Sequence, residues 1–171
     1  MPRNFHARFF VFVLFFVAGV VGADEWVQGQ VVSVHDGDTA TVATRDGKTL
    51  RVRFYGVDAP ERATEYWPDQ AFGKEAGDFM TDLLLNHAVK VRLTGEHTYQ
   101  REVGEIFIAD RSASRELLRV GLGWWNRPFA RKDATLCRLE QRARKAHIGL
   151  WRDKRPLAPW RYRKQYHSRE N

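Results

Sequence analysis

The chain has 171 residues, a formal net charge of +7 at pH 7 and a hydrophobic content of 43%. This length suits one domain with its own core, once any removable segment is set aside. The only cysteine, Cys137, excludes an intrachain disulfide, so packing alone must hold the fold. Because Cys137 lies within an apolar helical pattern, we expect a buried thiol.

The two halves of the chain differ in charge. Residues 24–110 contain 9 Lys and Arg against 16 Asp and Glu, whereas residues 111–171 contain 17 against 5. An acidic front half beside a basic back half indicates a cation site near a surface that binds a polyanion. The alternative is an ordinary solvated surface with a basic tail.

The N-terminus has the pattern of an export signal. A short basic start is followed by an apolar run over residues 9–21, which is shorter than the roughly 20 residues of a membrane span. Small residues at Val21-Gly22-Ala23 suit cleavage before Asp24. We therefore predict a signal peptide at 1–23 and a secreted or periplasmic protein, monomeric and without stable membrane association after cleavage. The alternative is an uncleaved N-terminal membrane anchor.

The first part of the mature chain reads as an antiparallel meander. Alternating and β-branched residues predict strands over 26–34, 39–44 and 49–57, with Gly29 as a candidate bulge. Asp36-Gly37 and Asp46-Gly47 are typical of tight turns between such strands.

Helical and strand patterns then alternate. Spacing predicts further elements, which are a helix over 72–84, strands over 89–93 and 106–109, a helix capped by Ser112 or Ser114 and ended by Gly121, and a helix from Asp133 to Gly149. Beyond Asp153 we expect little regular structure. Five strands and about three helices predict an α+β fold built on an oligonucleotide-binding-type β-barrel, with a domain over 24–152 and a basic C-terminal tail over 153–171.

Residues 53–61 carry three kinds of charged group in one short stretch. Arg53 offers a fork of donors, Asp58 is a hard oxygen ligand, and Glu61 follows Pro60 as a candidate base. Hydrolysis of a phosphate ester requires such groups, although the stretch is equally compatible with a half-buried strand ending in a charged turn. Arg53 and Glu61 serve one phosphate only if the chain bends sharply, which we expect at the Asp58-Ala59-Pro60 corner, with Gly56 just before it.

Asp36 and Asp38 point to one side of an extended segment. Pairing of neighbouring strands would bring Asp38 near Asp58, so that two carboxylates and the carbonyl of Ala59 form an all-oxygen site suited to Ca²⁺ or Mg²⁺ and not to zinc. The alternative for Asp36-Gly37-Asp38 is a plain hairpin turn.

Arg101 is a candidate second cation for the same phosphate, because it precedes the fifth predicted strand. Without Arg53, a surface ion pair with Glu102 or Glu105 would be the simpler interpretation. Such a pair contributes only about 0–1 kcal/mol.

These motifs, taken together, resemble the staphylococcal-nuclease-type family over essentially all of residues 26–151. The resemblance rests on five motifs in one order: Asp36-Gly37-Asp38-Thr39, residues 53–61, Tyr99-Gln100-Arg101, residues 121–125 and residues 143–151.

The resemblance implies a Ca²⁺-dependent endonuclease that cuts DNA and RNA with little sequence preference and leaves 3′-phosphate ends. It places Asp38, Asp58 and the carbonyl of Ala59 on the metal. Glu61 orients or deprotonates the attacking water. Arg53 and Arg101 bind the phosphate and neutralise charge in the transition state, a role for which lysine is a poor substitute.

The chain departs from the family pattern in the loops around the site. Gln100 stands where the family usually has glycine, His97 replaces a common aspartate, and Asn126 and Phe129 fall where tyrosines are frequent. Tyr99 is a candidate stacking or phosphate contact, with a packed surface aromatic as the alternative.

Two other functions remain compatible with the sequence. A catalytically silent nucleic-acid-binding module on the same fold is the chief alternative, although no residue of the catalytic set is missing. A surface-anchored interaction domain that retains the Phe-rich segment is the other.

Overall fold

The computed structural model describes residues 25–65 and 68–167. Its element order begins with the strands β1 (Glu25–Val34), β2 (Thr39–Thr44), β3 (Thr49–Phe54) and β4 (Val57–Asp58), followed by α1 (Gly73–Leu84). The remaining elements are β5 (Ala88–Thr98), β6 (Arg101–Ile108), β7 (Arg111–Ser112), α2 (Ala113–Arg119), β8 (Trp124–Trp125), α3 (Ala134–Lys145), the 3₁₀ helix η1 (Gly149–Arg152) and α4 (Pro159–His167). The predicted signal peptide lies outside the described residues.

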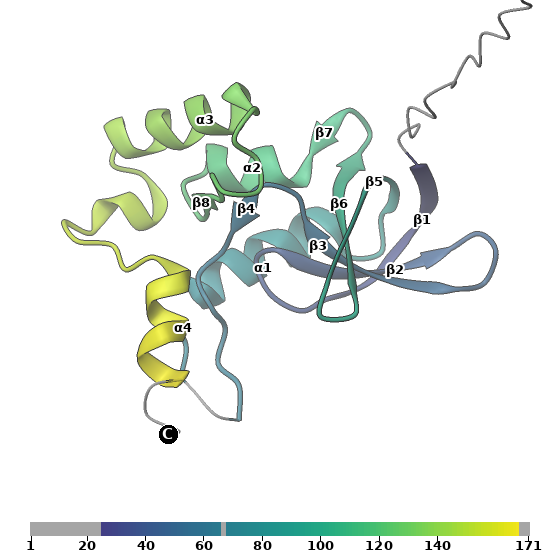
Figure 1. The fold of residues 1–171 in the computed structure, drawn as a ribbon, viewed down its shortest axis with the longest axis horizontal. Coiled ribbons are helices and arrows are strands. Elements are labelled where there is room, and N and C mark those ends of the chain that lie inside the picture. Colours follow the sequence, from purple (N-terminus) through teal and green to yellow (C-terminus); the bar gives the residue numbers. More distant parts are fainter. Residues whose placement is uncertain (1–24, 66–67, 168–171) are drawn as a thin grey trace, which may run out of the picture.

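The predicted barrel is confirmed. The main sheet has the order β3-β2-β1-β5-β6-β7, and a parallel pairing of β3 with β6 closes it (Figure 1). A long β1 makes this possible, because its first half pairs with β5 and its second half with β2. The bulge of β1 falls between Val31 and Ser33, not at Gly29 as expected.

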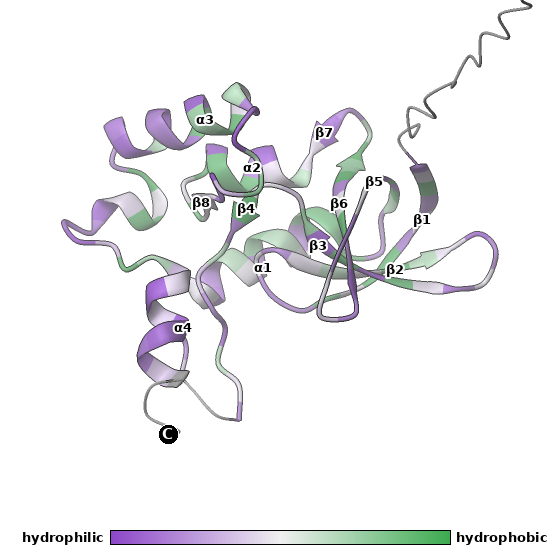
Figure 2. Ribbon diagram, viewed as in Figure 1, coloured by the Kyte–Doolittle hydropathy of each residue, from purple (hydrophilic) through white to green (hydrophobic). Residues whose placement is uncertain are grey.

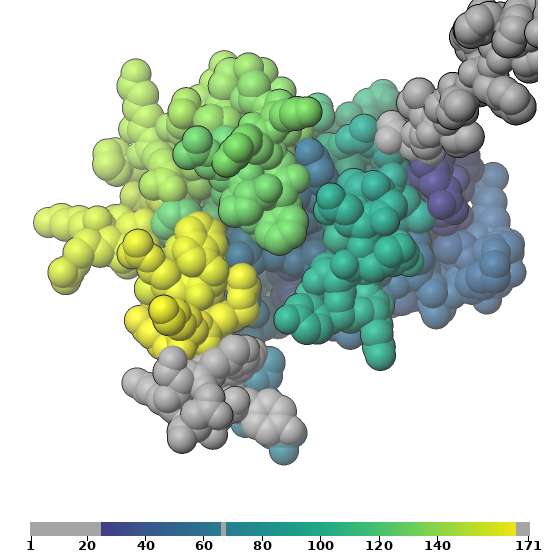
Figure 3. Space-filling view, in the orientation of Figure 1, coloured from purple at the N-terminus to yellow at the C-terminus, as the bar shows by residue number. Residues whose placement is uncertain are grey.

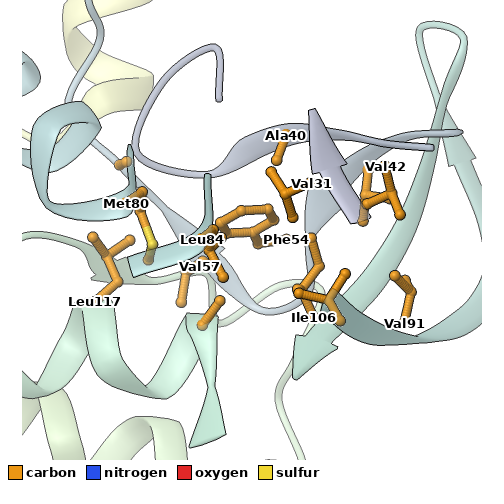
Figure 4. Close-up of a cluster of buried hydrophobic side chains, with 14 of the residues drawn as sticks. Val31, Ala40, Val42, Phe54, Val57, Met80, Leu84, Val91, Ile106 and Leu117 are labelled. Atoms are coloured by element: carbon orange, nitrogen blue, oxygen red, sulfur yellow. The ribbon is translucent and has the colours of Figure 1, made fainter. Parts of the chain in front are cut away.

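The core fills the barrel and continues under the helices. Figure 4 shows side chains of the strands meeting those of α1 and α2 around Phe54. The fully buried members include Val31, Val42, Val52, Phe54, Met80, Leu84, Ile106, Leu117 and Leu118. Burying each large apolar side chain contributes about 1.5–3 kcal/mol to the free energy of folding. The core therefore stabilises the fold without an intrachain disulfide.

Two predicted helix starts are confirmed by their caps. The Ser112 side chain accepts the Arg115 N–H at the start of α2, and Asp133 accepts the N–H groups of Thr135 and Leu136 at the start of α3. Cys137 is only partly buried, which corrects the expected buried thiol.

The basic tail forms a fourth helix, α4, contrary to the expectation of little regular structure beyond Asp153. Pro159 suits the first helical position, where its missing N–H costs no hydrogen bond. The ribbon of α4 is mostly hydrophilic in Figure 2. Burial of an apolar helix face therefore does not by itself fix α4 against the rest of the protein. Among the described residues, no helix is both long and apolar enough to cross a membrane.

Side-chain contacts attach α4 to the rest of the fold. The Tyr162 hydroxyl donates to the Pro68 carbonyl at 2.6 Å, and Gln70 Nε2 donates to the Leu157 carbonyl at 2.6 Å. The Trp160 and Trp124 rings pack edge-to-face with their centroids 5.4 Å apart, and the Trp124 and Trp151 rings do so with their centroids 4.4 Å apart.

Candidate functional site

The site occupies a cavity of about 780 Å³ beside the barrel. Its walls come from the turn before β2, the segment after β3, the β5–β6 hairpin and α4. In Figure 3, the hairpin (teal) and α4 (yellow) stand on either side of a hollow, with earlier parts of the chain (blue) behind it. The cavity lining includes Asp38, Arg53, Ala59, Glu61 and Arg101 among the predicted site residues.

Asp38 is placed by a tight turn. Its N–H donates to Asp36 Oδ1 at 2.9 Å, and the adjacent Gly37 approaches so closely that a Cβ there would lie 2.6 Å from the Ala59 Cβ. Asp38 is 6% exposed, and its Oδ2 accepts the Ala59 N–H at 2.6 Å. The turn is therefore bonded directly to the end of β4, as the metal-site prediction required.

Residues 53–61 bend at Gly56, just before the expected corner. Gly56 adopts a φ of +72°, which separates β3 from β4, and β4 then pairs with β8. This reversal turns Asp58 back toward Arg53. The expected bend at Asp58-Ala59-Pro60 is thus displaced by two residues, because the left-handed turn needs the glycine.

Arg53 joins the two aspartates. Its guanidinium forms an ion pair with Asp38 and another with Asp58, where Nη2 lies 2.7 Å from Oδ1. Only 13% of the Arg53 side chain is exposed. Burial lowers the pKa of Arg53, but Asp38 and Asp58 outweigh this effect and raise it, so the cation is permanent.

Arg101 reaches the same cavity from the start of β6. Its Nη1 lies 3.4 Å from Thr39 Oγ1, and its Nε donates to the Thr98 carbonyl at 3.3 Å. Burial lowers the pKa of Arg101, and the positive charge of the neighbouring Arg53 lowers it further. No ion pair with Glu102 or Glu105 is found for Arg101 among the described residues, so the surface-pair alternative is not supported.

The β5–β6 hairpin carries two of the unusual loop residues, His97 and Gln100, and the segment after β8 carries the other two, Asn126 and Phe129. Tyr99 is 92% exposed and lines the cavity, which makes it an available contact and not a packed aromatic. Both Tyr99 and Gln100 adopt positive φ, at 46° and 62°. The glycine usual at position 100 would adopt this conformation freely. His97 pairs with Glu102 at 3.0 Å, and Asn126 and Phe129 line the cavity.

The acidic residues suit a hard cation. Burial raises the pKa of Asp38 well above its ordinary value, with Arg53 opposing and Asp36 and Asp58 adding to the rise. A buried carboxylate pair of this kind favours binding a cation or a proton. Within the described ranges there is no cluster of three or more His, Cys, Asp or Glu arranged as a metal site. The donor set expected from the sequence, two carboxylates and the carbonyl of Ala59 completed by water, would hold a hard cation only once Arg53 and, from α4, Arg163 release the carboxylate oxygens that they contact here.

Glu61 is held by the segment that follows it. Its N–H donates to Gln70 Oε1 at 3.1 Å, and its carbonyl accepts the Gln70 N–H at 2.9 Å. Burial raises the pKa of the Glu61 carboxyl, while Arg163 opposes the rise. A raised pKa is a property of groups that exchange protons near neutral pH.

Arg163 is a site residue that sequence reasoning missed. From α4, its Nη2 lies 2.8 Å from Asp58 Oδ2, and its Nη1 lies 2.5 Å from Glu61 Oε1 and 3.1 Å from Asp58 Oδ1. The Ala158-Pro159-Trp160 sequence would have indicated a helix start. Nothing distinguishes Arg163 itself from the other cations of the tail.

Comparisons with known proteins agree with this geometry. The family model described as staphylococcal nuclease homologue matches residues 51–153. A protein named uncharacterized endonuclease from Escherichia coli O157:H7 is 32% identical over 138 residues, covering 80% of this chain and 85% of that protein. A second protein of that name, from Haemophilus influenzae, is 29% identical over 136 residues, covering 80% of this chain and 72% of its own length. The micrococcal nuclease of Shigella flexneri is 29% identical over 157 residues, covering 85% and 86%. The chain belongs to the staphylococcal nuclease family.

Proposed function

We propose that this chain is an exported, calcium-dependent endonuclease that hydrolyses phosphodiester bonds of DNA and RNA with little sequence specificity and leaves 3′-phosphate ends. The family and the nuclease names of its relatives support the class of enzyme, a phosphodiester hydrolase. The single observation that carries the finer proposal is that Asp38, Glu61, Arg53 and Arg101 line one cavity, with Asp58 buried behind its wall in an ion pair with Arg53.

The arginines account for substrate binding. The guanidinium fork matches two oxygens of a phosphate, so Arg53 and Arg101 together orient the scissile group and stabilise the charge that builds up on it. Their close approach, which lowers the pKa of Arg101, is favourable once an anion lies between them.

The carboxylates divide into two roles. Asp38 and Asp58, with the carbonyl of Ala59, would hold the Ca²⁺ ion. When bound, the ion supplies Lewis-acid stabilisation of the phosphoryl oxygens. Glu61, three residues after Asp58, orients the attacking water and takes its proton. Burial keeps that carboxylate basic enough for the task.

The test is cleavage of DNA and RNA by the purified chain with Ca²⁺, with Mg²⁺ and with a chelator. We expect cleavage of both polymers with Ca²⁺, little with Mg²⁺ and none with chelator, and mass spectrometry of the products should show 3′-phosphate ends. Nucleic-acid binding without cleavage under every condition would favour the catalytically silent module instead.

A second measurement tests Glu61 directly. Glu61→Gln preserves the size and the hydrogen-bonding backbone but removes the base, so kcat should fall about 10²–10⁴-fold while oligonucleotide affinity is kept. Full activity in Glu61→Gln would remove Glu61 from this role.

Export, the monomeric state and the absence of membrane association are proposals that rest on the apolar pattern of residues 9–21. N-terminal sequencing of the protein recovered outside the cytoplasm should start at Asp24. Recovery of the intact chain in the membrane fraction would show an anchor instead.

A further inference from the structure

The helix α4 lies outside the residues matched by the family model, which end at 153, yet it lines the same cavity. Three residues of this helix line the cavity: Trp160, Arg163 and Lys164. Residues spaced three and four apart lie on one side of a helix, so this side of α4 is a continuous wall. Arg163 contacts Asp58 and Glu61, but the proposed reaction gives none of these three residues a role in binding substrate.

The chemistry of the wall is that of a single-strand binding surface. Trp160 is 45% exposed although its ring packs on Trp124, so almost half of the residue's surface remains accessible to a ligand. Beside it stand two cations, Arg163 and Lys164. An aromatic platform next to cations is what proteins use to bind unpaired bases and their phosphates.

The contacts of Arg163 fit an arginine that exchanges one anion for another. Its guanidinium grips both oxygens of Asp58 and one of Glu61, and about a third of the side chain (34%) remains exposed. Asp58 already has Arg53 as a second partner at 2.7 Å. A phosphodiester offers the same two-oxygen face as a carboxylate, so Arg163 can turn to it without leaving Asp58 unpaired.

The charge balance of the site points the same way. Four carboxylates line the cavity, those of Asp36, Asp38, Glu61 and Glu96, so Arg53 and Arg101 alone would leave an excess of negative charge toward an incoming phosphate. Arg163 and Lys164 of α4 add two positive charges. They therefore reduce a repulsion that would otherwise oppose substrate entry.

We propose that α4 adds a nucleotide-binding subsite to the active site, in which Trp160 stacks on an unpaired base and Arg163 binds a phosphate of the same single strand. The proposal rests on the proposed nuclease function and names a preference within it. A single-stranded DNA or RNA segment has free base faces and fits this wall, whereas the stacked bases of a duplex do not present them.

The experiment measures binding of a fluorescent single-stranded phosphorothioate oligonucleotide and of the matching duplex to the full chain. Anisotropy titrations are run with Ca²⁺ and with chelator at several salt concentrations. The variants are Arg163→Gln, Arg163→Lys, Trp160→Leu and Trp160→Phe. The control is Arg161→Gln, which removes one exposed charge from the same helix but away from the cavity.

We expect Arg163→Gln to raise the single-strand Kd about tenfold and to reduce the slope of log K against log salt by about 0.7, the loss of one phosphate contact. Arg163→Lys should recover the slope but only part of the affinity, because it lacks the fork. Trp160→Leu keeps apolar packing on Trp124 and should raise Kd about tenfold with an unchanged slope, while Trp160→Phe should stay near wild type. Duplex binding should change less in every case.

Unchanged single-strand binding in both Arg163→Gln and Trp160→Leu would overturn the subsite. Tighter binding with faster cleavage in Arg163→Gln would also overturn it, because Arg163 would then be an intramolecular inhibitor of the site. If the wild type cleaves nucleic acid and the variants bind the single strand normally, the subsite is wrong and the nuclease function stands. If the wild type cleaves nothing and the variants lose single-strand binding, the nuclease function is wrong and the subsite stands.

Discussion

Two arginines reach the cavity from different sides of it and are held there by different means. Arg101 begins β6, whose position is fixed by backbone pairing with both β5 and β3. Arg163 lies on α4, which is attached by side chains, chiefly those of Gln70, Tyr162 and Trp160. The sheet thus specifies one cation through many cooperative hydrogen bonds, whereas a few separable contacts specify the other. The first should be hard to displace and the second easy.

The largest expected effect is on the sheet-held cation. Arg101→Lys keeps the charge but loses the planar fork, so kcat should fall about 10²–10³-fold at saturating Ca²⁺. Arg51→Lys is a matched control, because Arg51 is exposed on β3 and lies outside the cavity. Steady-state cleavage of a short oligonucleotide measures both. Near-normal kcat in Arg101→Lys would mean that only charge matters at this position.

The next effect concerns the bend that brings Asp58 to Arg53. Gly56→Ala would force a side chain into a positive φ and place its Cβ 2.4 Å from Leu136 Cδ1, so the free energy of unfolding should fall by about 2–4 kcal/mol. Gly47→Ala is the control, since Gly47 has a φ of +81° but nothing within 4 Å. It should cost only about 1–2 kcal/mol. Equal losses in urea unfolding would show that packing at Gly56 contributes nothing.

A smaller effect should separate α4 from the barrel. Tyr162→Phe removes the hydrogen bond to Pro68, worth about 0.5–1.5 kcal/mol. Hydrogen exchange should speed up across α4 and leave the barrel strands unchanged, because few contacts couple them. Tyr99→Phe, at an exposed position, should alter neither region. Faster exchange throughout the barrel would show that α4 and the sheet unfold as one unit.

The smallest effect lies at the hairpin tip. Gln100 has a φ of 62°, which costs a non-glycine residue strain, while glycine carries its own entropic cost in the unfolded chain. Gln100→Gly should therefore stabilise the fold by a net of about 0.5 kcal/mol, seen as a small rise in Tm. A fall in Tm would indicate that the Gln100 side chain makes a stabilising contact.

Most of the barrel could be predicted from local patterns. Strand alternation, two Asp-Gly turns and helix caps at Ser112 and Asp133 are each visible within a few residues of sequence. The same holds only in part for the meeting of Asp38 with the end of β4. Pairing of β2 with β3 brings the chain near Asp38, but the reversal at Gly56 is also needed. The bend lies at Gly56, two residues before the expected corner, because proline is the stronger local signal whereas the φ of +72° at Gly56 is visible only in the structure. Packing against Leu136 adds to the requirement for glycine.

Arg163 lay beyond local reasoning for a physical reason. Its partners Asp58 and Glu61 are more than a hundred positions away, and α4 is positioned by side-chain anchors and not by a sheet register. The excess of Lys and Arg indicated that the tail binds a polyanion. The charge of the tail does not show, however, which of its cations pairs with the carboxylates of the site. Only the structure shows that α4 forms one wall of the site.

The contact between Trp160 and Trp124 has a spectroscopic consequence. Trp160, Trp124 and Trp151 form a chain of indole rings with neighbouring centroids 5.4 Å and 4.4 Å apart, two of them beneath the guanidinium of Arg144. Rings this close couple electronically, so the near-ultraviolet circular dichroism of the native chain carries a contribution from the docked α4. The attachment of that helix can thus be followed in solution without a label, as nucleic acid or calcium is added.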